Sequence, residues 1–591
     1  MQPFEHFIML AHQLNSHEQL EVPREVTLEQ VADALHCTPR NAKLVLRKLT
    51  DAGLITWQAG RGRGNRSKLA FLAGKTHILI ELSRQYAEKE EYKQAFELLQ
   101  RYDAGTQAIE SFTEWLSGSF GFGKSRGEGN ETVDTLRLPL SQPILTLDPS
   151  ECFYSLESHM VQQLFDPLVR YDAAEDRILP QIAHTWDSSE DATLWTFHLR
   201  KGVFFHNGKE LGAEDVVFTF KRMQTGKRNS WPLRFLIGVE AASPRTVRFK
   251  LAKPNRIFPR FLCLNALSIL PLDYAGENEK QFWKQPIGTG PFQLAEWTDE
   301  RFVLHANARY YQGRPHLDSV HIVFIPSSAS ADQALWQQLL YDPGKQEDDL
   351  ESWQSTVSKH CCTSLLSWNM NKPGQHQSAD FRRAVDLILN RSQMLRELGG
   401  YRLHIARGFF HDEQAETELY RYDLEEARRL LADYDGTPLS LGTYGKHLQD
   451  AEWVQQQCAV VGIPLHIRYE QMDHIQEIPV MNEMDIILHA VVFPEEEICM
   501  IENYEQAGSF TKQFQTPDWH EYVREHVDQA LNCDSSAERW RLLTDIETRL
   551  RDDAHALFLL HSRFQSYFSP SYRGVGINSH GWIDFKEIWR T

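Results

Sequence analysis

The sequence predicts a multidomain protein in which a small, positively charged α+β domain precedes a much larger α/β domain. At roughly 100–200 residues per domain, a chain of 591 residues predicts about three to six domains. The whole chain carries a net charge of −19, yet residues 36–75 hold nine cations and a single acid, Asp51. From about residue 133 onward, strand-like runs such as TVRFKL and VHIVFI alternate with helix-like ones such as DFRRAVDLILN. That alternation is typical of an α/β domain with substantial sheets.

Composition excludes several classes of protein. Apolar residues make up 42% of the chain, which is too much for a disordered protein. No run of about 18 apolar residues occurs, and the first ten residues lack a basic start and include Glu5, so neither a membrane span nor a signal peptide is expected. The eight cysteines show no CxxC spacing. We therefore expect a cytoplasmic protein with reduced thiols, no metal site and no cofactor.

Changes in pattern divide the chain into four segments. Residues 1–75 form the small basic domain, and residues 76–117 carry an apolar stripe that predicts a helical connector. Residues 118–134 are rich in glycine and predict a flexible linker. Residues 135–591 form the large α/β domain.

Local chemistry predicts three helices in the small domain. The first covers residues 4–14, whose apolar side chains share one face. Thr27 and Gln30 form a possible capping box at the start of the second helix. Thr38 caps the third helix, and Gly53 is suited to end it in a left-handed conformation.

The third helix and the residues after it carry the positive charge. Its buried face is predicted from the spacing of Ala42, Val45, Leu46 and Leu49. Two short strands joined by a glycine/arginine loop follow, and this order resembles the winged helix-turn-helix fold, which implies binding of double-stranded DNA. The candidate DNA contacts are Thr38, Arg40, Asn41, Lys43, Arg47, Lys48, Arg61, Arg63, Arg66 and Lys68. The alternatives are a solvated basic helix and a winged helix used for protein contacts.

Two motifs of enzymes occur in the glycine-rich segment. Residues 118–125 match the phosphate-loop pattern GxxxxGK[ST] with Lys124, and residues 123–127 match GxSxG. Both motifs require a strand before the loop and a helix after it. Here the preceding residues predict a helix, and the following ones do not favour one. We therefore expect no catalytic site, and an ATPase that uses Lys124 is a rejected alternative.

The large domain contains a run that identifies a family. Residues 181–223 include QIAHTW and WTFHLRKGVFFHNGKELGAEDVVFTF, and residues 286–292, 308–318 and 365–385 add further motifs in the same order. This series resembles the extracytoplasmic solute-binding proteins of family 5, which serve ABC importers of peptides and nickel. The resemblance implies a two-lobed α/β domain of the periplasmic-binding-protein type II kind, with a ligand between the lobes.

By position in that family, five residues are candidates for ligand binding. They are Phe153, Tyr154, Trp368, Tyr401 and Glu495. The aromatic ones are equally compatible with a role in the core. Peptide binders of the family carry an Asp-Pro stretch that residues 486–497 lack, and Glu495 could supply the missing charge. A sugar, a sugar phosphate and a peptide all remain candidate ligands.

A winged helix in front of a family 5 domain resembles the SgrR family of transcriptional regulators. The similarity includes residues 54–64 and the closing segment 578–589. It implies a cytoplasmic regulator that binds DNA and responds to a small solute, with RNA polymerase as a further candidate partner and no membrane partner. The alternative is a solute-binding protein of an ABC transporter. Oligomeric state stays open.

Overall fold

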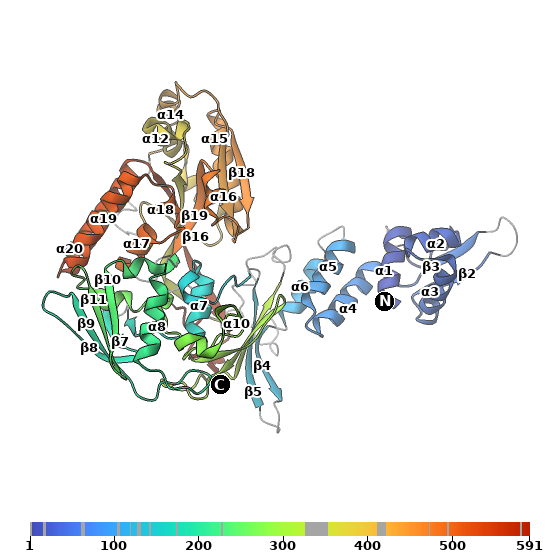
Figure 1. Ribbon diagram of the computed structural model, residues 1–591. Coiled ribbons are helices and arrows are strands. Elements are labelled where there is room, and N and C mark those ends of the chain that lie inside the picture. Colours follow the sequence, from blue (N-terminus) through green and yellow to red (C-terminus); the bar gives the residue numbers. More distant parts are fainter. Residues whose placement is uncertain are drawn as a thin grey trace.

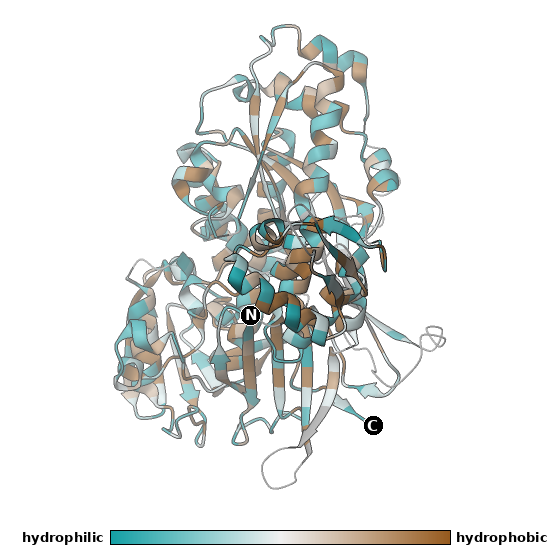
Figure 2. Ribbon diagram, turned by 90° about the vertical axis from the view of Figure 1, so that its right-hand side faces the viewer, coloured by the Kyte–Doolittle hydropathy of each residue, from teal (hydrophilic) through white to brown (hydrophobic). Residues whose placement is uncertain are grey.

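The protein consists of an N-terminal module that projects from a two-lobed large domain (Figure 1). The computed structural model describes residues 3–15, 19–60, 66–102, 107–118, 120–126, 132–140, 143–172, 175–225, 228–325, 353–410, 421–471, 473–492, 496–578 and 582–591. Hydrophobic residues are frequent in the strands of the large domain, whereas its helices carry both hydrophobic and hydrophilic residues (Figure 2).

The first part of the module is the expected helical domain with a hairpin. Its elements are α1 (Pro3–Leu14), β1 (Arg24–Val26), α2 (Leu28–Ala34), α3 (Pro39–Asp51), β2 (Ile55–Gln58) and β3 (Ser67–Phe71). The capping box of Thr27 and Gln30 is present, the Thr38 hydroxyl accepts a hydrogen bond from the Asn41 amide, and Gly53 has φ +70°. The structure adds the short strand β1, which pairs with β3 and completes a sheet of order β1-β3-β2.

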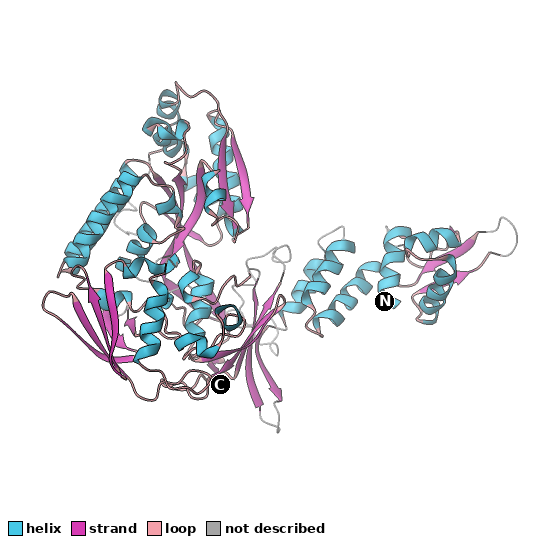
Figure 3. Cartoon of the chain, viewed as in Figure 1, coloured by secondary structure: helices cyan, strands magenta, loops and turns pink. Residues whose placement is uncertain are grey.

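Three further helices connect this domain to the large one (Figure 3). They are α4 (Lys75–Ala87), α5 (Tyr92–Tyr102) and α6 (Gln107–Ser117). One hydrophobic core runs from Phe7 in α1 through Phe71 in β3 to Phe96 and Phe112 in the connector. The division between residues 1–75 and 76–117 remains a sequence-based prediction, since both segments contribute to this core.

The expectation of a flexible linker over residues 118–134 is wrong for most of that segment. The chain forms β4 (Gly121–Arg126) and β5 (Thr132–Leu140), which pair in antiparallel register from Gly121–Arg137 to Arg126–Thr132. Phe120 is buried in the core of the module, and Phe122 is buried in the core of the first lobe. The high glycine content of the segment led to the prediction of a flexible linker, although these two phenylalanines are buried.

The first lobe contains two main sheets. Its elements after β5 are α7 (Ser155–Leu164), β6 (Val169–Asp172), β7 (Arg177–Pro180), β8 (Ala183–Ser188), β9 (Leu194–Leu199), α8 (Ala213–Met223), β10 (Leu236–Ser243), β11 (Thr246–Leu251), α9 (Phe258–Phe261), α10 (Glu279–Phe282), β12 (Phe292–Trp297), β13 (Arg301–Ala306) and β14 (Ser319–Phe324). The sheet orders are β10-β11-β9-β8 and β12-β13-β14-β5-β4.

The family motifs of this lobe form the turns and strands that the sequence predicts. Strand β9 alternates buried and less buried side chains, and Gly208 has φ +84° in the turn before α8. Gly288 lies so close to the end of α7 that a Cβ there would be 1.9 Å from the Leu164 carbonyl oxygen. The glycine-containing turn before β12 is therefore required by packing.

The second lobe is built on one six-stranded sheet of order β16-β20-β15-β19-β17-β18. Its elements are β15 (Gln354–Trp368), α12 (Ala379–Ile388), α13 (Arg391–Leu398), β16 (Arg402–Ile405), α14 (Leu424–Leu430), β17 (Leu439–Tyr444), α15 (Leu448–Val460), β18 (Leu465–Glu470), α16 (Ile478–Asn482), β19 (Ile486–Val492), α17 (Glu496–Glu505), α18 (Phe510–Gln513), α19 (Pro517–Asn532), α20 (Ser536–Asp552) and β20 (Ala556–Phe568). The chain ends with β21 (Tyr572–Arg573) and β22 (Trp589–Arg590) beside the first lobe.

Two paired strands join the lobes. Strands β15 and β20 are antiparallel, with Gln354 opposite Phe568 at one end and Ser367 opposite Ala556 at the other. Phe568 lies in the core of the first lobe, whereas Leu366 lies in that of the second. Any change in the angle between the lobes must therefore be accommodated by these two strands.

Strand β14 is buried on both faces, and each face belongs to a different core. Val320 and Ile322 pack in the core of the first lobe. Val323, together with Ile325 just after the strand, packs in the core of the N-terminal module. Near this contact the Arg301 side chain forms an ion pair with Glu90, which follows α4. The apolar run VHIVFI thus serves two hydrophobic cores at once.

Because the two faces of β14 pack in different cores, substitutions at adjacent positions of this strand should destabilise different parts of the molecule. Ile322→Ala opens a cavity in the first lobe, and Val323→Ala opens one in the module, each costing roughly 2 kcal/mol. In amide hydrogen exchange, Ile322→Ala should speed exchange in α7 and β5, and Val323→Ala should speed it in α4–α6. The same exchange pattern in both variants would contradict the assignment of the two faces.

Candidate functional site

The outward face of α3 forms an exposed cationic surface. Ala42, Val45, Leu46 and Leu49 are buried as predicted. Arg40, Lys43, Arg47 and Lys48 are exposed, as is Asn41. Asp51 lies 3.9 Å from Arg47, and both side chains are more than 70% exposed, so this pair neutralises little charge.

The strand side of the same domain adds two more exposed cations. Arg66 and Lys68 are exposed before and within β3. Arg61 and Arg63, which belong to the predicted loop between β2 and β3, lie outside the described residues. Thr38 is exposed, and its hydroxyl lies 3.4 Å from the Asn41 amide as a helix cap. The described candidates therefore share one domain and are open to a polyanion.

A second candidate site lies where the two lobes meet. Phe153 and Tyr154 of the first lobe contact Tyr444 and Phe510 of the second, and we call these four residues the interlobe ring cluster. Ring centroids are 5.1 Å apart for Phe153 and Tyr154, 6.1 Å for Phe153 and Phe510, 6.1 Å for Tyr154 and Tyr444, and 6.0 Å for Tyr444 and Phe510. Two of the proposed ligand contacts are therefore at the interface between the lobes.

Arg228 places a cation beside the ring cluster. Its guanidinium carbon is 5.3 Å from the centre of the Phe153 ring, within the range of a cation–π contact. The same side chain donates a hydrogen bond to the Gln476 side chain across the interface. Burial raises the pKa of Glu157 on α7 to about 7, and Arg228 opposes that shift.

The neighbouring Asn229 also links the lobes. Its side chain donates to the Cys152 carbonyl at 2.8 Å and accepts a hydrogen bond from Gln506 at 2.6 Å. Burial, followed by the nearby Tyr444, raises the pKa of Tyr154, so its hydroxyl stays protonated. Rings, a guanidinium, amides and a phenol are suited to bind a solute that has both apolar faces and polar edges.

Trp368 and Tyr401, the other described candidates for ligand contact, lie away from the ring cluster. Trp368 is 1% exposed in the core of the second lobe and stacks on His376 at 6.0 Å, which favours the core role that the sequence left open for it. Tyr401 is half-buried, with the Arg402 guanidinium 4.5 Å from its ring centre, and Arg402 forms a buried ion pair with Asp450 at 2.8 Å. Glu495 lies outside the described residues.

Sequence reasoning missed Tyr444, Phe510, Arg228 and Gln476. They lie 74 or more positions from Phe153 and Tyr154 along the chain, in segments with no motif of their own. The only local signal is at Tyr444, which ends β17 directly before Gly445 with φ +54°. Without the fold, nothing in the sequence groups these residues.

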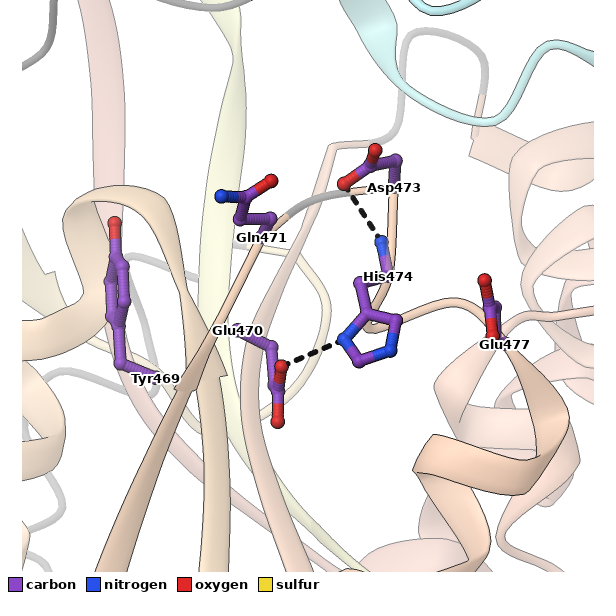
Figure 4. Close-up of a pocket in the computed structure, with 6 residues that line it drawn as sticks. All are labelled: Tyr469, Glu470, Gln471, Asp473, His474 and Glu477. Atoms are coloured by element: carbon purple, nitrogen blue, oxygen red, sulfur yellow. Dashed lines mark hydrogen bonds and ion pairs between the residues drawn. The ribbon is translucent and has the colours of Figure 1, made fainter.

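A surface pocket at the end of β18 does not form a comparable site (Figure 4). It is lined by Tyr469, Glu470, Gln471, Asp473, His474 and Glu477. The Glu470 carboxylate already accepts hydrogen bonds from Arg468 at 3.1 Å and His474 at 2.9 Å, and Glu470 raises the pKa of His474. Within the described part of the chain, no group of three or more His, Cys, Asp or Glu side chains is arranged to hold a metal ion.

The phosphate-loop match does not adopt the geometry of that motif. Helix α6 precedes it, and residues 121–126 are a strand whose backbone pairs with β5. None of the helices that the structure describes has the length and apolar character needed to cross a bilayer.

Both parts of the chain resemble known proteins. Residues 177–493 match the family model of bacterial extracellular solute-binding proteins, family 5 Middle, and residues 4–118 match that of the sugar transport-related sRNA regulator N-term. Uncharacterized protein YhjP of Bacillus subtilis is 32% identical over 573 residues, and HTH-type transcriptional regulator SgrR of Yersinia enterocolitica is 26% identical over 587 residues. Each alignment covers 96% of this chain and 96% of the relative.

Solved structures establish the fold of the large domain. The ABC transporter-associated periplasmic binding protein DppA from Helicobacter pylori, in complex with peptide STSA, superposes with a TM-score of 0.67 at 21% identity. The match covers 77% of this chain and 98% of that protein. The large domain therefore has the two-lobed, type II binding-protein architecture that the sequence motifs predict, and at this identity the similarity concerns the fold alone.

A buried histidine behind the ring cluster predicts a pH dependence of stability. Nε2 of His489 is 2.9 Å from the Ser367 hydroxyl, and its ring is 5.1 Å from Phe510. Burial lowers the pKa of His489 to about 3. Because an unfolded histidine has a pKa of about 6.5, only the unfolded state takes up this proton as the pH falls from 7 to 5, which costs about 2 kcal/mol of stability.

His489→Gln should therefore lose about 2 kcal/mol less stability than the wild type between pH 7 and pH 5. Urea unfolding at pH 7, 6 and 5 at constant ionic strength measures the difference. The exposed His77→Gln is the matched control and should keep the wild-type dependence. Parallel curves for His489→Gln and wild type would show that His489 is not buried in its neutral form.

Proposed function

Since the chain belongs to the SgrR-like fusions of an N-terminal regulator domain with a family 5 solute-binding domain, we propose that it is a cytoplasmic, ligand-responsive, DNA-binding transcriptional regulator. The observation that carries the proposal is the exposed cationic face of α3 in a chain whose net charge is −19. In such a regulator no catalytic step is needed, and RNA polymerase is the further partner expected.

DNA binding is supported by the order of elements and by charge. Helix α3 follows α2 after a short turn, as the recognition helix of a helix-turn-helix does. Its exposed Arg40 and Asn41 are residue types that hydrogen-bond base edges, and Lys43, Arg47 and Lys48 suit phosphates. Arg66 and Lys68, with Arg61 and Arg63 of the loop, would contact backbone phosphate from the wing.

The ligand of this proposal is a small solute bound between the lobes at Phe153 and Tyr154, with Tyr401 and Glu495 as further candidates. A sugar, a sugar phosphate or a short peptide fits the mixture of rings and hydrogen-bonding groups. Since Arg228 and Asn229 already contact Gln476 and Gln506 of the other lobe, a ligand there would change the contacts that hold the lobes together.

The attachment of the module supports a link between ligand and DNA. The module shares the strand β14 with the first lobe, and that strand precedes the crossing strand β15. A ligand that favours one arrangement of the lobes would therefore act on β15, the strand that follows β14 along the chain, and β14 is the strand on which the module packs. Linkage requires that the ligand changes DNA affinity by the same factor by which DNA changes ligand affinity.

The alternative function is that of a binding protein for an ABC transporter, which the solved structure of DppA exemplifies. The match of residues 4–118 to a regulator domain favours the regulator instead. Specific binding of the full chain to DNA separates the two functions, because a transport protein has no need of it.

The DNA-binding proposal predicts a strong dependence on salt. Each phosphate contact contributes a slope of about −0.9 to the plot of log affinity against log salt. Arg47→Ala should therefore make that slope about 0.9 less negative and weaken binding to all sequences alike. Gel-shift titrations at four salt concentrations measure it.

Arg101→Ala on α5 removes the same charge from an exposed position of the module away from α3, and its slope should equal that of the wild type. Equal slopes for Arg47→Ala and wild type would mean that α3 does not face the phosphates.

The proposed ligand site at the interlobe ring cluster predicts that Arg228 is needed to bind the ligand and is not needed to bind DNA. Thirteen of the 15 tryptophans follow residue 135, so ligand binding can be followed by intrinsic fluorescence with glucose, glucose 6-phosphate and trialanine as probes. Arg228→Ala removes a charged hydrogen bond and should weaken the probe that binds by roughly 10-fold or more. Its DNA affinity without a probe should be unchanged.

Arg248→Ala on β11, half-exposed in a pair with Glu240, is the matched control of the same lobe. If Arg228→Ala binds the probe as tightly as Arg248→Ala does, the ligand lies away from the ring cluster.

A further inference from the structure

An exposed leucine lies at the centre of the cationic face of α3. Leu44 is 57% exposed. On a helix the surface neighbours of a residue are three and four positions away, and for Leu44 these are Arg40, Asn41, Arg47 and Lys48. All four are exposed and polar, and three are cations.

Leu44 has no part in the packing of the module. The buried face of α3 is on the opposite side of the helix, and the module core includes Val45 and Leu46 but not Leu44. A single exposed leucine is ordinary on a protein surface. A leucine surrounded by cations on the helix that the proposed function directs at DNA is a more specific arrangement.

We propose that Leu44 contacts the C5-methyl group of a thymine in the major groove and so selects a thymine at one position of the binding site. This inference rests on the proposed function. The major groove displays one apolar group among its hydrogen-bonding atoms, the thymine methyl, and an aliphatic side chain recognises it by contact. The flanking cations would hold the helix against the phosphates while Leu44 reaches the bases.

The positive charge of this surface indicates which partner binds it. The exposed cations of α3 are Arg40, Lys43, Arg47 and Lys48. A second copy of the chain that bound this surface through its own α3 would bring four like charges against these four and would be repelled. Double-stranded DNA supplies both the negative charge and the methyl group that the surface lacks. The leucine and the surrounding cations thus favour the same partner.

The experiment compares thymine with uracil, which differs only in lacking the methyl group. A binding site is first selected from a random duplex pool with the full chain, and each thymine in it is then replaced by uracil. For the wild type, one replacement should lower affinity about four-fold, the factor expected for ~0.8 kcal/mol from one buried methyl group. Leu44→Ala should bind the thymine and uracil duplexes equally at that position.

Leu72→Ala removes another exposed leucine of the same domain, outside α3, and should keep the preference for thymine. A preference that persists in Leu44→Ala, or a selected site in which no thymine methyl matters, overturns the inference while DNA binding stands. Failure of the wild type to enrich any sequence overturns the inference and the proposed function together. Since alanine favours helices and position 44 is exposed, Leu44→Ala should fold normally.

Discussion

The burial of β14 on both faces is the constraint on which the arrangement of the whole chain depends. One face completes the core of the first lobe with Val320 and Ile322, and the other contributes Val323 to the core of the N-terminal module. A strand between two cores cannot shift its register without exposing apolar side chains on both sides. Side-chain packing on this strand therefore attaches the module to the first lobe, and the ion pair of Arg301 with Glu90 lies beside this joint.

The glycine-rich segment strengthens the same joint. Phe120 reaches the core of the module and Phe122 that of the first lobe, and the Phe122 amide donates a hydrogen bond of 3.0 Å to the Tyr572 hydroxyl. Tyr572 follows β20, the strand that returns from the second lobe. The chain that leaves the module thus contacts the segment that follows the interlobe crossing. This contact is close in sequence to β20, one of the two strands that must accommodate any change in the angle between the lobes.

The interface between the lobes is held differently. Four aromatic rings and the polar contacts of Arg228 and Asn229 meet there, in addition to the paired strands β15 and β20 and a hydrophobic core that contains residues of both lobes. The ring and polar contacts can be exchanged for contacts with a ligand, whereas opening the core that both lobes share would expose apolar side chains to water.

The sequence alone determined the helices of the module, the caps at Thr27 and Thr38, both faces of α3 and the two-lobed fold of the large domain. These features depend on neighbours within a few positions, or on motifs that retain their order, and both are legible along a chain. Only the tertiary structure decided that glycine-rich residues 121–126 form a strand, that Trp368 is a core residue, and that Tyr444 and Phe510 join Phe153 and Tyr154. The physical reason is that these outcomes depend on packing between segments far apart in the sequence, whose burial no local pattern records.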